Sequence, residues 1–240
     1  MSNQDAPLIE LVYEHPDFIV VNKPSGIAVQ DEELSVGILV ILCQQLQIEK
    51  LWLVHRLDKV TSGLLILAKS AQAASNLGKL FEARQIEKFY IALSSQKPKK
   101  KQGCVSGCMK KIRDGKWALA DTGKSAAITQ FFSTSVAPGI RLFLLKPHTG
   151  KTHQLRVMLK SLGSPILGDT FYKGQHSDRT YLHAYSLRFE YEGQAISIQF
   201  LPNSGEYFLT EQFELAVQQY LTPWLLTWPV IKRAKTAGTE

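Results

Sequence analysis

Cysteine is scarce in this chain, and no apolar run in it is long. The three cysteines among 240 residues are Cys43, Cys104 and Cys108. A closed zinc site needs four ligands, and no second Cys/His pair lies at ligand spacing from Cys104 and Cys108, so we expect no metal and free thiols in a reducing compartment. The apolar run "GILVILC" is too short to span a bilayer, and the N-terminal segment has acids where a signal peptide is basic and apolar. The sequence therefore predicts a cytoplasmic protein that is not in a membrane.

Phosphate-binding loops are also missing. "GKS" at Gly123 and "GKT" at Gly150 resemble the ends of such loops. The loop requires a glycine five residues earlier, where its backbone amides can wrap a phosphate. Those positions hold Ala118 and Leu145, so a nucleotide-binding loop is not expected in either place.

Positive charge is present in excess, and it is concentrated. The formal net charge is +7, and the segment Lys97–Lys116 contains eight Lys/Arg against one acid, Asp114, so this segment alone carries the whole excess. Such a run is compatible with a polyanionic partner such as RNA. The alternative is a solvated loop that keeps the protein soluble. The sequence leaves the role of this segment open.

Strand and helix patterns alternate without a regular βαβ rhythm, which predicts an α+β fold with a mixed, mostly antiparallel central β-sheet flanked by helices. A buried strand over Phe18–Val21 is followed by a turn at Pro24 and Gly26 and then by more strand. A helix is expected to begin near Ser35, and another after Ser70 as N-cap. The remaining expected elements are strands at 63–69, 86–93, 125–136, 140–148, 181–191 and 196–202, a hairpin with an Asp-Gly turn at 113–116, and helices at 151–163 and 208–221.

The chain shows no internal repeat and no low-complexity linker. We therefore expect one catalytic domain over residues 1–220, followed by a partly flexible C-terminal extension over 221–240. A monomer is expected, because no exposed apolar repeat suggests an interface between copies.

One short stretch, "LVHRLDKVTSGLLILAKS" from Leu53, places Arg56 and Asp58 directly before an apolar strand. The simplest interpretation is a structural ion pair. An aspartyl-phosphate site has the opposite order, because there the acid follows the buried strand. A paired-carboxylate glycosidase would need a second acid, and Asp31, Glu32, Glu33 and Asp169 are available, although nothing in the sequence sets their distances.

The whole pattern is more specific. "HRLDKVTSGLLILAK" resembles the signature of the RluA family of RNA pseudouridine synthases, and other family motifs follow in the family's order. The resemblance covers about Ile9 to Pro202 and begins so early that we expect a short form without an N-terminal S4 domain. Lys151 and Met158 depart from the family, which usually has Arg and often His there. The matching segments are "NKPSG" at 22–26, "EKFY" at 87–90, "TGKTHQLRVML" at 149–159, "GSPILGDTFY" at 163–172 and "YLHAYSLRF" at 181–189.

The resemblance implies an isomerase that converts specific uridines of ribosomal or transfer RNA to pseudouridine, with no cofactor. It implies that Asp58 is the catalyst, as nucleophile or as base, on a uridine flipped out of its stack. Arg156 would pair with Asp58, and Tyr90 would lie against the uracil. Arg56 would fill the gap left in the RNA or contact a phosphate, and Lys23 is a candidate for a phosphate contact. The alternative is an RNA-binding module with a silent pocket. Which RNA is modified remains open.

Overall fold

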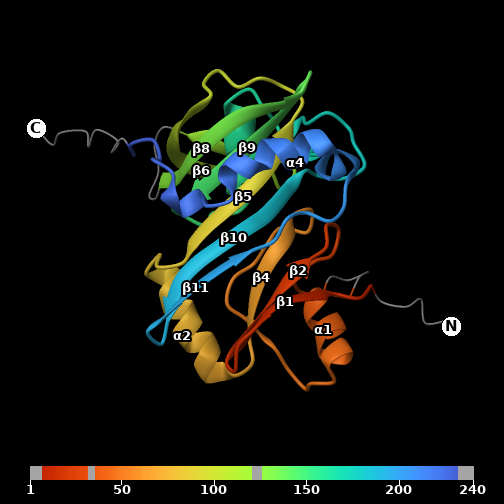
Figure 1. The fold of residues 1–240 in the computed structure, drawn as a ribbon, viewed down its shortest axis with the longest axis vertical. Coiled ribbons are helices and arrows are strands. Elements are labelled where there is room, and N and C mark those ends of the chain that lie inside the picture. The colour runs from red at the N-terminus through yellow and green to blue at the C-terminus, as the bar shows by residue number, and fades with distance from the viewer. Residues whose placement is uncertain (1–6, 32–35, 121–125, 232–240) are drawn as a thin grey trace, which may run out of the picture. The chain divides into compact units, whose positions relative to one another are not determined.

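The structure is a computed structural model that describes residues 7–31, 36–120 and 126–231. The chain forms two compact units (Figure 1). The first comprises the residues up to Ile91 together with Asp178–Leu209, and the second comprises Ala92–Ser177 together with the residues from Thr210 onward. Strand β5 (Glu87–Ser94) contains the first of the two points at which the chain passes from the first unit into the second. The predicted boundary at residue 220 stays a prediction.

The first unit is built on a mixed sheet with the strand order β1-β2-β4-β10, in which β3 also pairs with β4 and β11 with β10. Strands β4 and β10 run parallel, and the β1–β2, β2–β4, β3–β4 and β10–β11 pairs are antiparallel. Strands β2 and β4 are buried along their whole length, as their continuous apolar sequences predicted. The strands are β1 (Glu10–Glu14), β2 (Phe18–Lys23), β3 (Trp52–Leu53), β4 (Ser62–Ala68), β10 (Leu182–Tyr191) and β11 (Gln194–Gln199).

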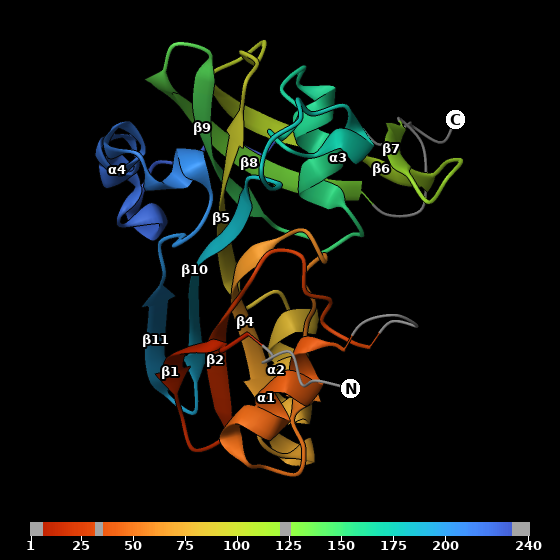
Figure 2. The same cartoon turned by 90° about the vertical axis from the view of Figure 1, so that its right-hand side faces the viewer.

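Two helices, α1 (Ile38–Leu46) and α2 (Ala71–Glu82), lie on the same face of this sheet (Figure 2). Their apolar sides pack into one core with β2 and β4. The Ser70 side chain accepts a hydrogen bond from the backbone N–H of Ala73, which confirms the predicted N-cap. Helix α1 begins after Gly37, whose N–H donates to the Asp31 carboxylate over 2.7 Å. The predicted start near Ser35 lies outside the described residues.

The second unit has the antiparallel strand order β9-β8-β6-β7. Helix α3 (Gln154–Ser161) and helix α4 (Glu211–Val217) lie on opposite faces of this sheet (Figure 2). The hairpin of β6 and β7 has the predicted Asp-Gly turn, with Asp114 and Gly115 both at positive φ. The strands are β6 (Gln102–Lys111), β7 (Trp117–Ala120), β8 (Ala126–Ala137) and β9 (Ile140–Pro147).

The predicted α+β class with a mixed, mostly antiparallel sheet is confirmed, and most predicted elements are found within a few residues. The strand expected after the turn at Gly26 is wrong, because residues 27–30 form no strand. A short 3₁₀ turn at Thr170–Tyr172 precedes β10. Three more lie on either side of α4, at Glu206–Leu209, Gln218–Tyr220 and Pro223–Leu225. In the described part of the chain, no helix is long and apolar enough to cross a membrane.

The C-terminal segment packs on the second unit as far as it is described. The Trp228 ring lies 4.9 Å from the ring of Phe132, between centroids, and the Gln130 side-chain amide donates to the Pro229 carbonyl. These contacts dock residues 221–231 on β8. Residues 232–240, where the sequence predicted flexibility, lie outside the described residues.

Gly63 makes the close approach of β4 and β10 possible. It has φ +105° and pairs with Ala184, and a Cβ atom at Gly63 would lie 2.3 Å from the Ala184 carbonyl oxygen. Both the backbone angle and the contact therefore require glycine.

We expect Gly63→Ala to lower the free energy of unfolding by at least about 2 kcal/mol, because it adds strain and a backbone clash. Gly78→Ala is the matched control, since a Cβ there meets nothing within 4 Å on α2. That control should raise stability by up to about 1 kcal/mol. Denaturant unfolding measures both, and equal effects of the two substitutions would contradict the strand-contact argument.

Candidate active site

The segment that carries Asp58 is a tight turn between β3 and β4. The Thr61 backbone N–H donates to the Asp58 carbonyl over 2.9 Å, which closes the turn. Leu57 is 4% exposed and anchors the turn in the core. Asp58 is half-buried and Arg56 is exposed. The turn therefore offers an acid and a cation from one short, anchored piece of backbone.

His55 fixes the start of this turn. Its Nε2 accepts a hydrogen bond from the Ile66 backbone N–H over 2.9 Å, and its ring stacks on Phe81 with centroids 4.5 Å apart. Burial, and then the nearby Lys88 ammonium, lower the pKa of His55 to about 3. A neutral ring with an unprotonated Nε2 is what this acceptor role requires. His55 is thus a positioning residue of the Asp58 turn.

Lys23 ties a second turn to the first. Its side chain is 0% exposed, and its Nζ donates to the carbonyls of Pro24, Ile27 and Lys59 over 2.8, 2.7 and 3.1 Å. An ammonium group has three donors, so all of them point to protein carbonyls. This geometry favours a positioning role over the phosphate contact that the sequence suggested.

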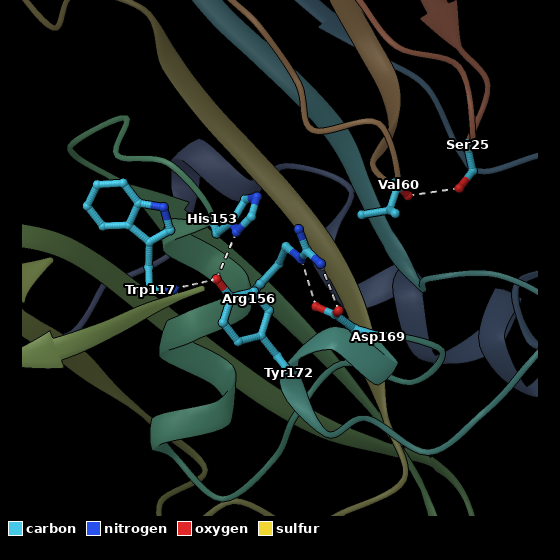
Figure 3. Close-up of polar contacts among 7 residues, drawn as sticks. All are labelled: Ser25, Val60, Trp117, His153, Arg156, Asp169 and Tyr172. Atoms are coloured by element: carbon cyan, nitrogen blue, oxygen red, sulfur yellow. Dashed lines mark hydrogen bonds and ion pairs between the residues drawn. The ribbon is translucent and has the colours of Figure 1, made fainter. Parts of the chain in front are cut away.

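Two further hydrogen bonds join the same turns. The Gly26 backbone N–H donates to the Lys59 carbonyl over 2.8 Å. The Ser25 hydroxyl donates to the Val60 carbonyl, also over 2.8 Å (Figure 3). The "NKPSG" and "HRLDKVTSG" motifs, more than thirty residues apart, thus form one hydrogen-bonded structure. Its apex is the backbone that follows Asp58.

Electrostatic effects place Lys23 and Tyr90 within the field of Asp58. Burial and the Arg179 guanidinium lower the pKa of Lys23 to about 7, and the Asp58 carboxylate opposes this shift. Burial, and then Asp58, raise the pKa of Tyr90 above its ordinary value, so its phenol keeps its proton. Tyr90 lies on β5, half-buried. The structure therefore brings three of the predicted site residues, Asp58, Tyr90 and Lys23, into one electrostatic neighbourhood, with Arg56 on the same turn.

A polar relay supports the first residue of β4, and sequence reasoning missed it. The Nε2 of His183 lies 2.9 Å from the Phe200 carbonyl, which can only accept, so Nε2 carries the proton. Nδ1 is then the acceptor for the Ser62 hydroxyl, 2.8 Å away, and Arg179 donates to the Ser62 oxygen. Burial is the main cause that lowers the pKa of His183 to about 3, so it stays neutral. The only sequence signal for Arg179 is its place two residues before the "YLHAYSLRF" motif.

Arg156 lies in the second unit, where its neighbours are well defined. It is 6% exposed on α3, and its Nε and Nη2 donate to the two carboxylate oxygens of Asp169 over 2.7 and 2.8 Å (Figure 3). Its guanidinium carbon lies 4.9 Å from the centroid of the Tyr172 ring and 5.5 Å from that of Phe171. The fork and the rings fix the guanidinium plane. The pairing of Arg156 with Asp58 stays a prediction.

Tyr172 connects this arginine to the β6–β7 hairpin. Its hydroxyl oxygen accepts from the Trp117 backbone N–H over 3.0 Å and lies 2.7 Å from His153 Nδ1 (Figure 3). His153 is the residue that precedes α3. The first residue of β7, the start of α3 and Arg156 therefore share one buried tyrosine. The "GDTFY" segment gave the only sequence signal for Asp169 and Tyr172.

The two residues that depart from the family pattern have different surroundings. Lys151 is exposed before α3, and Met158 is 0% exposed within it. Among the described residues, no group of three or more His, Cys, Asp and Glu is arranged to hold a metal ion. The three cysteines are unbridged.

Comparison with known proteins agrees with the motifs found in the sequence. The sequence pattern of the RNA pseudouridylate synthase family matches residues 17–161. This chain belongs to that family. A Haemophilus influenzae protein described as an uncharacterized RNA pseudouridine synthase is 52% identical over 216 residues, which cover 89% of this chain and 96% of the relative. The predicted resemblance is thereby confirmed.

Relatives with assigned RNAs are more distant. The dual-specificity RNA pseudouridine synthase RluA of Salmonella typhi is 32% identical, over 81% of this chain and 92% of its own. A Pasteurella multocida tRNA pseudouridine synthase C is 33% identical, over 71% and 77%. The solved human RNA Pseudouridylate Synthase Domain Containing 4 is 27% identical and matches 85% of this chain and 93% of its own with a TM-score of 0.69. The chain is an RNA pseudouridine synthase, an isomerase.

The Lys23 environment gives a pH prediction. A lysine side chain in the unfolded chain keeps its proton up to its ordinary pKa of 10.5, but Lys23 loses its proton near pH 7 in the folded protein. Between these values the unfolded state holds more protons, so the contribution of Lys23 to stability rises with pH and is lost as pH falls towards 7.

The quantity to follow is the difference in free energy of unfolding between the wild type and Lys23→Met. We expect the wild type's advantage to increase from pH 7 to pH 9. The slope should approach about 1.4 kcal/mol per pH unit at most. Urea unfolding of both proteins at a series of pH values measures this difference. The contributions of other titrating groups cancel, because both proteins contain them. A flat difference would mean that the three carbonyls keep Lys23 protonated over this range, and it would contradict the lowered pKa.

Proposed function

We propose that this chain isomerises specific uridines of ribosomal or transfer RNA with Asp58 as the catalyst. In this reaction the N1–C1′ glycosidic bond of the uridine breaks, the uracil turns within the site, and a C5–C1′ bond forms. The hydrogen on C5 is lost and N1 gains one, so the product is an isomer and no oxidant or reductant is consumed. Asp58 acts on the ribose, as a nucleophile or as a base.

The observation that carries this proposal is the anchoring of Asp58. Its turn is held by Leu57 in the core, by His55 on β4 and by Lys23 on the Lys59 carbonyl. Catalysis requires that a reacting group be held in place before the substrate arrives. A half-buried carboxylate on so constrained a turn meets that requirement, and the segment around it nearly completely matches the family motif.

Arg156 has the properties needed to stabilise an ionised acid. A guanidinium stays charged at any working pH, and here Asp169, Tyr172 and Phe171 hold it rigidly. We assign to it the stabilisation of the Asp58 carboxylate. An unpaired carboxylate in a pocket that excludes water would be costly.

Tyr90 and Arg56 serve the flipped nucleotide. Tyr90 lies against the uracil ring, and burial and then Asp58 keep its phenol protonated. Extruding the base costs about a few kcal/mol in lost stacking. Arg56 is exposed beside Asp58 and fills the gap in the RNA or contacts a phosphate. The substrate class follows the names of the relatives, one described as a tRNA enzyme and another as dual-specificity.

The direct test is Asp58→Asn, which removes the charge and keeps the shape. Acting on RNA from cells that lack the gene, the purified variant should form pseudouridine at least about 10³-fold more slowly than the wild type. Its affinity for RNA should stay within a few-fold, because the fold is unchanged. Mass spectrometry of digested RNA measures product, and filter binding measures affinity.

Glu192→Gln is the matched control, since it makes the same chemical change at an exposed turn between β10 and β11. It should keep full activity. Full activity of Asp58→Asn would remove Asp58 from the mechanism. Binding without product by the wild type, on every RNA tried, would favour a silent RNA-binding module.

A further inference from the structure

The largest feature that the proposed chemistry does not use is the basic hairpin of β6 and β7. Of the eight basic residues in Lys97–Lys116, all but Lys116 are exposed. The one acid, Asp114, is confined to the turn. The rest of the chain has equal numbers of basic and acidic residues, so the segment Lys97–Lys116 carries the net charge of the protein.

The cations form two groups at opposite ends of β6. The base group, Lys97, Lys99, Lys100 and Lys101, precedes the strand, and the tip group, Lys110, Lys111, Arg113 and Lys116, ends it and continues through the turn. At the rise of an antiparallel strand, Lys101 and Lys110 are about 30 Å apart. One phosphate or a small anion cannot contact both groups, so the pattern suits an extended polyanion.

A cavity of about 650 Å³ lies at the base group. Lys99 and Lys100 line it together with polar and apolar residues, which include Gln102, Ser106, Phe131 and Val230. A volume of this size accommodates a nucleotide unit. The base of the hairpin is therefore a shaped recess with charge, and not a flat lysine-rich surface alone.

The hairpin is held rigidly within the second unit. Strand β6 pairs with β8 from Gln102↔Phe132 to Cys108↔Ala126. On the other side, the Trp117 N–H is bound by Tyr172, and the Lys116 ammonium lies 5.1 Å from the centroid of the Phe171 ring. These are the same two rings that stack on Arg156. RNA held on the hairpin would thus be held at a fixed place relative to Arg156.

We propose that Lys97–Lys101 and the β6–β7 hairpin form an arm that binds the RNA backbone outside the target nucleotide. The assignment of RNA as the polyanion rests on the proposed function. The arm contributes phosphate contacts through exposed lysines, so it sets affinity and salt dependence and not the choice of base. An acidic protein is the other polyanion that such a surface attracts, but the nucleotide-sized recess and the link to Arg156 favour RNA.

The test compares three triple variants that each remove three positive charges. The tip variant is Lys110→Gln, Lys111→Gln and Arg113→Gln, and the base variant is Lys99→Gln, Lys100→Gln and Lys101→Gln. The matched control is Lys50→Gln, Lys79→Gln and Arg188→Gln, whose residues are exposed in the first unit. The probe is fluorescently labelled unfractionated transfer RNA, and its affinity is titrated over a range of salt concentrations.

We expect the tip and base variants each to bind at least tenfold more weakly than the control. The slope of log affinity against log salt should become shallower by about 2, since each lost phosphate contact removes about 0.7–0.9. With modifiable RNA, KM should rise while kcat at saturation is kept, because phosphate contacts bind ground state and transition state alike.

If the tip and base variants have the same RNA affinity and salt slope as the control, the proposed RNA-binding arm is contradicted. The proposal would also be contradicted if polyglutamate competes with the labelled RNA more strongly than unlabelled RNA of equal total charge does. Because binding is measured without turnover, the two proposals fail separately. If RNA binding depends on the hairpin but no pseudouridine forms, only the proposed function is overturned. If pseudouridine forms but RNA binding does not depend on the hairpin, only the RNA-binding arm is overturned.

Discussion

The Lys23 ammonium is the constraint on which the site depends. It lies in the interior with its three donors on three carbonyls, two from its own turn and one from Lys59. A buried cation is costly, and here the cost is offset by hydrogen bonds and by the field of Asp58. Because those carbonyls belong to two turns, the ammonium fixes one turn against the other and sets the backbone that follows Asp58.

The strands beneath these turns provide the frame. Gly63 allows β4 to approach β10, and the Ser62–His183 hydrogen bond links the same two strands one residue earlier. His55 holds the other end of the Asp58 segment on β4. In the second unit, Arg156 is set by Asp169 and Tyr172 in the same manner, as a cation surrounded by fixed partners. In each unit, buried polar groups with satisfied hydrogen bonds position the charges.

Local signals in the sequence were sufficient for most of the elements and for the residues within motifs. The apolar runs of β2 and β4, the Ser70 cap and the Asp-Gly turn are short-range features, and they were predicted correctly. The hydrogen bonds of Lys23 to Lys59, of Arg156 to Asp169 and of Ser62 to His183 were not predicted. Each of them depends on how segments that are distant in the sequence meet. The burial of Lys23 was not predicted for the same reason, because an isolated lysine in a turn looks like a surface residue. The first residue of α1 has no clear sequence signal, because Gly37 precedes it without a side-chain cap.

The most direct test of the account is a map of pseudouridines at single-nucleotide resolution. Total RNA would be taken from cells with the gene, cells without it, and deletion cells that express either the wild type or Asp58→Ala. The account predicts at least one uridine whose conversion is lost on deletion, restored by the wild type and not restored by the variant. A site restored equally by Asp58→Ala would contradict the assignment of Asp58, and a map that does not change on deletion would contradict the proposed activity on cellular RNA.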